Sequence, residues 1–400
     1  MNVSAATGDG KLVERRSLSA WALEHPIAYG FDLELTERCN NNCVHCYINV
    51  PADDAAALAR ELSAAEIIDI LYQAASLGAM TVRMTGGEPL LREDFAEIYR
   101  AARRLGVRVK LYTNACLMTP EIAALLAEIP PGEPVEVTCY GITEDSYEAI
   151  TRTPGSFSAF LGGIELLAAR AVPFGLKTVV LPPNRDEIAE LDEWVERHGA
   201  VRLPTTVTFL ELRGRRDSDA LNRTIERMRF APEDVVELQS ELFEEYEESM
   251  SRFCTRFMGV HGDELFSCGA GNRICVDAYG RAQACMLLRH PDTTYDLRQG
   301  TLRKAVTEFL PGLHELRAEN ETYLRRCAHC FLGGLCEQCP ARSWSEHGNL
   351  DTPVEYHCDI AHAQARHLGL LAEGERAWEV EDWRERIDSL RAALESRHGR

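Results

Sequence analysis

The 400-residue sequence has no long hydrophobic run and comparatively few basic residues. No window reaches the ~18–20 uninterrupted apolar residues of a membrane-spanning helix, and the N-terminal segment lacks the apolar core of a signal peptide. Lys and Arg total 43 against 63 Asp and Glu, which gives a formal net charge of −20. Because nucleic-acid binding depends on cationic contacts to phosphates, we do not expect nucleic acid as a partner. Since the sequence has no apolar span, we do not expect a membrane as a partner either. We expect a cytoplasmic protein.

Cysteine, in contrast, is abundant. The chain has 14 cysteines within a composition, 45% hydrophobic and 26% charged, that is typical of a folded globular protein. In a reducing compartment so many cysteines are seldom disulfides and more often metal ligands. They form a group of three within residues 39–46, two isolated residues, Cys116 and Cys139, and a group of nine from Cys254 to Cys358.

Apolar runs of strand length alternate with segments of helical periodicity over the first half of the chain. This alternation predicts βαβ crossovers and a parallel sheet, and two α/β architectures fit it: a doubly wound open sheet or a partial (β/α) barrel. In both, functional residues gather at the carboxyl ends of the strands. The expected strands are Phe31–Leu35, Thr81–Met84, Val107–Tyr112, Val135–Cys139, Leu176–Leu181 and Thr206–Leu210. The expected helices are Ser63–Leu77, Asp94–Leu105, Pro120–Ile129, Phe157–Ala169 and Glu187–His198.

The composition divides the chain into five parts. Within the third of them, Pro232–Met250 carries eight carboxylates and no basic residue, which is typical of a solvated helix face. The expected parts are an N-terminal segment (1–28), the α/β domain (29–214), an acidic helical linker (215–253), a cysteine-rich domain (254–360) and a helical tail (361–400).

Two motifs follow the first two expected strands. Cys39, Cys43 and Cys46 lie on one loop in the spacing CxxxCxxC. A structural zinc site requires four ligands and no nearby residue completes one, whereas a [4Fe–4S] cluster held by three cysteines keeps one iron open. Thr85–Pro89 (TGGEP) lies at the same edge of the sheet, where two glycines let backbone approach a ligand and Glu88 can accept from an ammonium group. In isolation, such a segment is typical of a tight turn before a helix.

Together these motifs resemble those of the radical S-adenosylmethionine (SAM) enzymes. The resemblance implies a partial (β/α)6 barrel, in agreement with the six expected strands. It also implies reductive cleavage of SAM to methionine and a 5′-deoxyadenosyl radical that abstracts hydrogen from a substrate. The implied roles are cluster ligands for Cys39, Cys43 and Cys46, the position beside adenine for His45, and the methionine end of SAM for Gly86, Gly87 and Glu88.

Three further polar residues stand at or near expected strand ends. Asn114 follows the third strand, Thr138 lies in the fourth and Lys177 lies in the fifth. By resemblance to the same family, Thr138 reaches the SAM ribose or carboxylate and Lys177 meets the carboxylate. The alternative is that all three are ordinary polar residues of a barrel rim.

The cysteine-rich region resembles the SPASM extension of radical SAM enzymes, which carries two auxiliary iron–sulfur clusters. The match covers Cys268 to Cys358, with one departure: the last pair is Cys336-x2-Cys339 where relatives commonly show three intervening residues. Zinc bound by the CxxC pairs is the alternative that the spacing leaves open. The implied ligands are Cys268, Cys285 and Cys339 for auxiliary cluster I, and Cys327, Cys330, Cys336 and Cys358 for auxiliary cluster II.

The fourth ligand of auxiliary cluster I stays open. Cys254 is the first choice, Cys275 in an expected strand is the second, and an iron open to substrate or water is the third.

The resemblance favours a peptide or protein substrate and a post-translational modification: a crosslink, a thioether or an epimerised residue. About thirty residues precede the first strand, too few for a peptide-binding winged-helix domain, so a leader peptide would be recognised by a separate protein. A flavodoxin- or ferredoxin-type protein is the expected reductant. The alternatives are a formylglycine-forming sulfatase-type maturase, a small-molecule enzyme of haem or cofactor biosynthesis, and a non-catalytic metal-binding scaffold.

Overall fold

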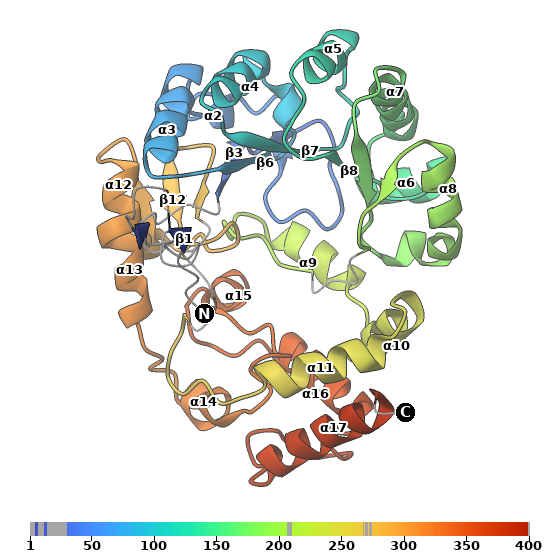
Figure 1. The fold of residues 1–400 in the computed structure, drawn as a ribbon, viewed down its shortest axis with the longest axis vertical. Coiled ribbons are helices and arrows are strands. Elements are labelled where there is room, and N and C mark those ends of the chain that lie inside the picture. The colour runs from blue at the N-terminus through green and yellow to red at the C-terminus, as the bar shows by residue number, and fades with distance from the viewer. Residues whose placement is uncertain are drawn as a thin grey trace.

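The computed structural model describes residues 30–205, 210–266, 268, 271 and 274–398, together with the paired strands β1 (Ala5–Ala6) and β2 (Leu12–Val13). Its centre is a nine-stranded sheet in the order β10-β9-β8-β7-β6-β3-β11-β12-β13 (Figure 1). The six strands from β10 to β3 are parallel, which confirms the α/β partial barrel. These strands are β3 (Phe31–Thr36), β6 (Thr81–Gly86), β7 (Arg108–Thr113), β8 (Val135–Thr138), β9 (Phe174–Lys177) and β10 (Val201–Arg202).

Helices cover the outer face of the parallel strands, as Figure 1 shows for the helices above β3 to β8. Side chains cap the starts of two of these helices: Ser63 and Glu66 form a capping box, and the Thr119 side chain accepts from Ile122 N. The helices are α2 (Ala55–Leu58), α3 (Ala64–Ser76), α4 (Phe95–Arg104), α5 (Pro120–Glu128), α6 (Glu144–Thr151), α7 (Ser156–Ala169) and α8 (Leu191–Arg197). Two short strands, β4 (Arg38–Cys39) and β5 (Val50–Pro51), flank the first cysteine motif.

Three elements differ from the sequence expectation. The fifth strand ends at Lys177 instead of Leu181, because the Asn184 side chain bonds Leu181 N and Val179 O and turns the chain into the 3₁₀ helix η2 (Pro182–Glu190). Four of the five residues of the expected strand Thr206–Leu210, residues 206–209, lie outside the described residues. The strand that pairs with β9 at this edge of the sheet is β10. Helix α6, which the sequence reading omitted, lies between β8 and α7.

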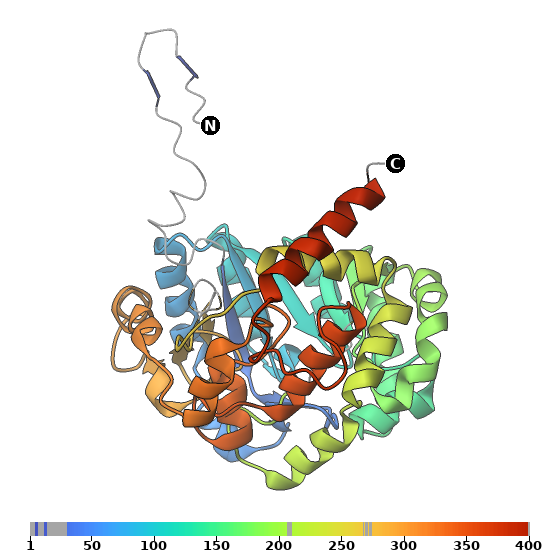
Figure 2. The ribbon, with the colours of Figure 1, turned by 90° about the horizontal axis from the view of Figure 1, so that it is seen from below.

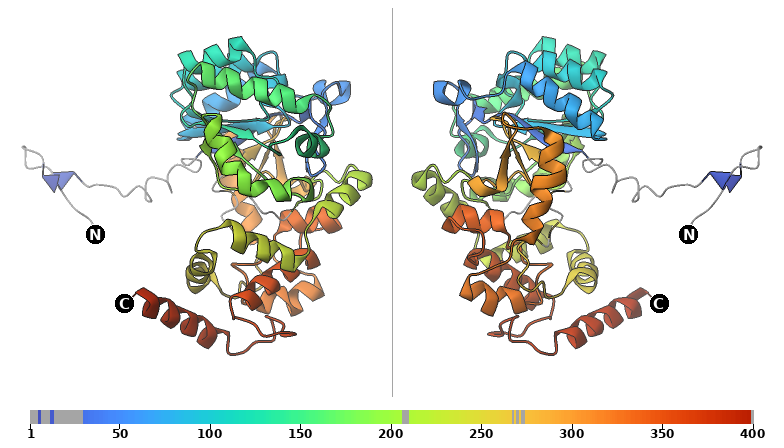
Figure 3. Two further views of the ribbon diagram at one scale, coloured as in Figure 1. Left: turned by 90° about the vertical axis from the view of Figure 1, so that its right-hand side faces the viewer. Right: turned by 90° about the vertical axis from the view of Figure 1, so that its left-hand side faces the viewer.

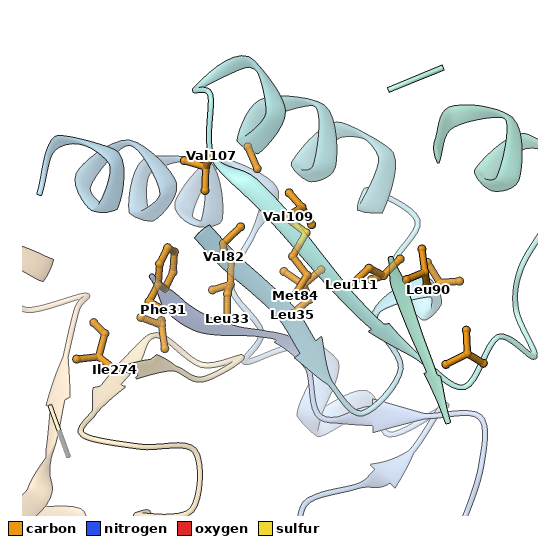
Figure 4. Close-up of a cluster of buried hydrophobic side chains, with 14 of the residues drawn as sticks. Phe31, Leu33, Leu35, Val82, Met84, Leu90, Val107, Val109, Leu111 and Ile274 are labelled. Atoms are coloured by element: carbon orange, nitrogen blue, oxygen red, sulfur yellow. The ribbon is translucent and has the colours of Figure 1, made fainter. Parts of the chain in front are cut away.

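The main core lies between the strands and the outer helices. Phe31, Leu33 and Leu35 alternate along β3 with polar residues, and Figure 4 shows their side chains beside those of β6 and β7. A strand places successive side chains on opposite faces, so the apolar set faces the helices and the polar set faces the barrel interior. This alternation gives the barrel a charged lumen.

The second half of the chain lies on the open side of the barrel, beneath the arc of strands in Figure 1 and below them in both views of Figure 3. Its first three strands extend the barrel sheet, since β11 pairs in parallel with β3. Helix α17 projects from the body (Figure 2). The elements are α9 (Asp219–Met228), α10 (Pro232–Leu242), α11 (Tyr246–Phe257), β11 (Cys275–Val276), β12 (Arg281–Gln283), β13 (Thr294–Asp296), α12 (Leu302–Lys304), α13 (Leu310–Gly312), α14 (Glu321–Arg325), α15 (Pro340–His347), α16 (Glu355–His367) and α17 (Trp383–His398).

The expected division into five parts stays a prediction. Helices α10 and α11 do contain the acidic run, whose apolar side buries Val235 and Leu238. The expected boundary at residue 360 falls inside α16. No helix among the described residues combines the length and the apolar character needed to cross a membrane.

A buried ion pair joins the two halves of the chain. Arg289 donates to Glu34 (2.6 Å) at the end of β3 and to Glu37 (2.9 Å), and all three side chains are at most 1% exposed. Arg215 donates to the same Glu37 carboxylate and to Asp277 (2.9 Å).

We expect Arg289→Met to lower the free energy of unfolding by about 3–5 kcal/mol, because it leaves the Glu34 charge buried without its partner. The matched control is Arg298→Met, whose pair with Glu66 is 43% exposed on both sides and is worth about 0–1 kcal/mol. Urea unfolding measures both. Equal losses would show that the buried pair does not anchor the second half of the chain.

Candidate functional site

The CxxxCxxC loop leaves β3 at the carboxyl end of the parallel sheet. Backbone hydrogen bonds from Asn42 N to Thr151 O (3.0 Å) and from Val44 N to Ile150 O (2.9 Å) attach it to helix α6. Burial, with a further contribution from the Cys46 thiol, raises the pKa of Cys43 to about 12. Burial likewise raises the pKa values of Cys39 and Cys46. Without a bound cation these thiols stay protonated, and a metal bound on the loop would replace their protons.

The TGGEP segment lies directly against the chain that leads into this loop. Gly87 N donates to Thr36 O (2.7 Å) and Glu88 N donates to Arg38 O (2.9 Å). A Cβ on Gly86 would lie 2.1 Å from Thr36 O, and one on Gly87 would lie 2.2 Å from Arg38 O. The two glycines are therefore required for backbone-to-backbone contact between the two motifs.

The Glu88 carboxylate is buried among protein donors and does not line the cavity described below. Its Oε1 accepts from Leu90 N (3.0 Å) and from the Thr113 hydroxyl (2.7 Å), and its Oε2 accepts from Asn114 N (2.8 Å). Burial raises the pKa of Glu88 to about 7 in spite of these hydrogen bonds. In this geometry Glu88 holds the end of β7 in place, and its expected contact with SAM stays a prediction.

A cavity of about 290 Å³ adjoins the cysteine loop at the carboxyl ends of β6, β7 and β8. Eight of the residues expected to bind the cluster or SAM line it together. They are Cys39, Cys43, Cys46, His45, Gly86, Gly87, Asn114 and Thr138.

His45 and Tyr140 form one wall of this cavity. Their rings meet edge to face with centroids 5.2 Å apart. Burial lowers the pKa of His45 to about 4, so its imidazole is neutral at pH 7. A neutral ring pair of this kind suits a flat heteroaromatic group.

A second cysteine-lined cavity, of about 70 Å³, lies in the second half of the chain. Cys327, Cys330, Cys336 and Cys358 line it together, and Cys339 adjoins them. Burial is the largest cause that raises the pKa of Cys327 to about 12, and the neighbouring thiols of Cys330 and Cys358 are the next largest. The four cysteines expected in auxiliary cluster II therefore lie around one space.

The cysteines expected in auxiliary cluster I also lie together. Burial and then Cys339 raise the pKa of Cys285 to about 11, with a smaller contribution from Cys268. Arg342 is buried between Cys339 and Glu211, and it donates to the Glu211 carboxylate at 2.7 Å. Glu211 in turn lines the 290 Å³ cavity, so Arg342 connects the two sites.

A family model described as the Radical SAM superfamily matches residues 33–195. An AdoMet-dependent heme synthase from Methanosarcina barkeri is 30% identical over 331 residues, which cover 79% of this chain and 92% of that protein. The chain belongs to the radical SAM superfamily.

Two further similarities accompany these matches. Mycofactocin maturase MftC from Mycolicibacterium smegmatis is 31% identical over 274 residues, which cover 67% of this chain and 66% of that protein. The structure of Streptococcus suis SuiB bound to precursor peptide SuiA has a TM-score of 0.60 at 16% identity, with 83% of this chain and 77% of that chain covered. The SuiB likeness supports the radical SAM partial-barrel fold.

Radical SAM enzymes hold a [4Fe–4S] cluster and SAM, and the donor set of this chain fits both. Cys39, Cys43 and Cys46 present three thiols to one cavity, and the glycine pair lies beside them. Backbone N–H groups already point at two of the sulfurs, from Asn41 to Cys39 and from Asn49 to Cys46, each at 3.4 Å. Such hydrogen bonds are typical around iron–sulfur clusters.

Besides Glu88, two expected site residues lie outside the groups described above. Lys177 does not line the cavity; its Nζ lies 3.4 Å from the Glu136 carboxylate inside the lumen. Cys254 packs in an apolar cluster with Phe331 and Leu335, and burial raises its pKa to about 12 with no thiol neighbour contributing. Cys254 thus lies in a different apolar cluster from the one against which Cys285 and Cys339 pack. The second choice, Cys275, lies buried in β11 as the strand prediction requires.

Among the cavity residues that were not predicted as site residues, four carry polar or polarisable groups far from the cysteine loop in sequence. Tyr112 and Tyr140 lie at strand ends, so their position on the rim was a usable signal. Glu211 and Met286 come from segments far along the chain, and no local pattern in the sequence indicates that they return to the barrel.

We expect Glu88→Gln to weaken SAM binding, because the glutamine amide must turn one N–H towards a donor. One unpaired buried donor costs the fold about 1–3 kcal/mol, and relaxation of Thr113 and Asn114 away from it would misplace the end of β7 that lines the cavity, which raises Kd. Equilibrium SAM binding to the reconstituted protein measures this, with cluster absorbance as the check that the iron is retained. Glu97→Gln, at an exposed position of α4, is the control. Equal affinity in both variants would contradict the positioning role of Glu88.

Proposed function

We propose that this radical SAM enzyme cleaves SAM reductively and abstracts hydrogen from a peptide substrate, giving a crosslink, a thioether or an epimerised residue. The observation that carries the first part is the contact between the cysteine loop and the TGGEP segment at one cavity. When bound, the cluster supplies the electron that splits SAM.

The residues of this chain then have separable roles. Cys39, Cys43 and Cys46 hold the cluster, and the glycine pair keeps the SAM end of the cavity free of side chains. His45, with Tyr140, orients the adenine, while Asn114 and Thr138 bind polar groups of SAM. The half-buried walls exclude water from the reacting atoms.

We further propose two auxiliary iron–sulfur clusters in the second half of the chain. Cys268, Cys285 and Cys339 hold the first, and Cys327, Cys330, Cys336 and Cys358 hold the second. The mutual effects of these thiols on their pKa values support this division. Cluster I then carries three cysteine ligands from this set, and Cys254 is not its fourth.

A peptide substrate is supported by the similarity to mycofactocin maturase MftC and to SuiB, whose structure holds precursor peptide SuiA. One observation favours a second candidate. The AdoMet-dependent heme synthase is matched over 92% of its length, so a tetrapyrrole substrate is the alternative.

We expect Cys43→Ala to abolish 5′-deoxyadenosine formation while the auxiliary clusters are retained, because the two sets of ligands lie in different parts of the fold. Anaerobic reconstitution of the unaltered chain should give roughly eight to twelve irons, the range for two or three clusters. Iron and sulfide analysis measures this. About four irons, all lost on the substitution, would remove the auxiliary clusters from the proposal.

We expect Cys254→Ala to keep its full iron content, and Cys339→Ala to lose the iron of one auxiliary cluster only. The reason is that Cys254 packs against apolar side chains, whereas Cys339 neighbours Cys285. Iron counting and electron paramagnetic resonance of both variants test this. Loss of a cluster signal in Cys254→Ala would restore it as a ligand.

The substrate class is tested by adding each of two candidate substrates to the reconstituted enzyme and comparing the rates of 5′-deoxyadenosine formation. One is a short precursor peptide encoded beside the gene of this chain, and the other is iron-coproporphyrin III. We expect only the peptide to accelerate SAM cleavage and to change mass. Acceleration by the tetrapyrrole, with decarboxylated product, would establish the alternative.

A further inference from the structure

The barrel lumen contains a layer of charged side chains directly beneath the cavity. Thr85 of β6, Tyr112 of β7 and Thr138 of β8 are among the residues that line the cavity. Two residues earlier on the same strands, and on the same faces, come Arg83, Lys110 and Glu136. Asp32 of β3 lies beside Arg83 in the sheet register, and Lys177 of β9 lies beside Thr138, one step nearer the cavity. We call these five residues together the lumen layer.

The lumen layer opens onto the cavity at Arg83. Its Nη1 lies 3.5 Å from Met286 Sδ, and its guanidinium lies 4.9 Å from the centroid of the Tyr112 ring. Both neighbours line the cavity. The buried Nε of Arg83 has no hydrogen-bond partner among the described residues.

The ion pairs within this layer are long. Arg83 lies 3.3 Å from Asp32, Lys110 lies 3.3 Å from Glu136 and Lys177 lies 3.4 Å from Glu136. Ion pairs that hold the fold are shorter: 2.6 Å for Arg289 with Glu34 and 2.7 Å for Arg342 with Glu211. Charge-assisted hydrogen bonds are typically about 2.7–2.9 Å, so the lumen cations keep donors for another acceptor.

The charges are also unbalanced. Three cations face two carboxylates, and the rim pair of Glu133 with Arg108 adds one charge of each sign. The sequence has only four lysines, Lys11, Lys110, Lys177 and Lys304, and two of them lie in this layer. The surplus of one positive charge is local to this layer, because the adjoining interior group of Arg215 and Arg289 with Glu34, Glu37 and Asp277 carries one more carboxylate than cations.

We propose that Arg83, Lys110 and Lys177 bind a carboxylate of the substrate, so that the enzyme selects a peptide with an acidic side chain next to the reacting residue. This proposal rests on the peptide substrate proposed above. Lys177 then serves substrate selection and not the SAM carboxylate. An incoming carboxylate balances the extra positive charge of the lumen layer and accepts hydrogen bonds from its Arg and Lys side chains.

The test measures lysine reactivity, which does not require turnover. The reconstituted enzyme with SAM is treated with N-hydroxysuccinimidyl acetate, and peptide mapping by mass spectrometry gives the acetylation rates of Lys177 and Lys110. Lys304, which is exposed on α12, is the internal reference. The probes are two pools of short end-blocked peptides that differ only in a central glutamate or glutamine.

We expect the glutamate pool to slow acetylation of Lys177 several-fold relative to Lys304, and the glutamine pool to have no effect. Arg83→Gln should reduce this protection, Arg83→Lys should retain part of it, and Arg303→Gln, an exposed change on α12 that keeps the Lys304 reference, should leave the protection of Lys177 unchanged. Equal protection by both pools, or by neither, would overturn the carboxylate site.

The same samples separate this inference from the proposed function. If both pools accelerate 5′-deoxyadenosine formation equally without selective protection, the peptide substrate stands and the carboxylate site fails. If iron-coproporphyrin III protects Lys177 while neither pool does, the peptide substrate and this inference fail together.

Discussion

The buried ion pair of Arg289 with Glu34 and Glu37 is the interaction on which the site depends. Both carboxylates lie at the carboxyl end of β3, and Glu37 is two residues before Cys39. The Glu37 carbonyl also accepts from Val50 N (2.9 Å), which closes the cysteine loop at its base. Arg289 comes from the second half of the chain, so the geometry of the cysteine loop depends on residues about 250 positions away.

The interior of the barrel follows from the same alternation that builds its core. Each parallel strand places apolar side chains against the helices and polar ones inside. A closed barrel would fill this interior with branched apolar residues. Here the interior carries Arg83, Lys110 and Glu136, which is tolerable because the barrel is partial and its lumen meets an open cavity.

Much of the fold and the core of the site could be predicted from the sequence, because local patterns specify them. Periodicity locates five of the six parallel strands, and the contact between Gly86 and Thr36 explains why the two motifs occur together. Long-range packing set the rest. Nothing near Cys254 in the sequence indicates its apolar neighbours, and nothing near Met286 indicates its return to the barrel. The sequence places Glu88 at this end of the sheet, but only the fold shows that its carboxylate accepts three hydrogen bonds from the protein itself.

The parallel pairing of β11 with β3 has a consequence for how the chain is made. Without residues 274–296, β3 would be an edge strand with unpaired backbone groups, including the N–H of Asp32 that donates to Ile274 O (2.9 Å). Unpaired strand edges promote association with other chains. During synthesis the barrel emerges first, so its sheet stays open on that side until the later strands arrive. A fragment that ends before β11 would therefore aggregate in place of behaving as an independent barrel.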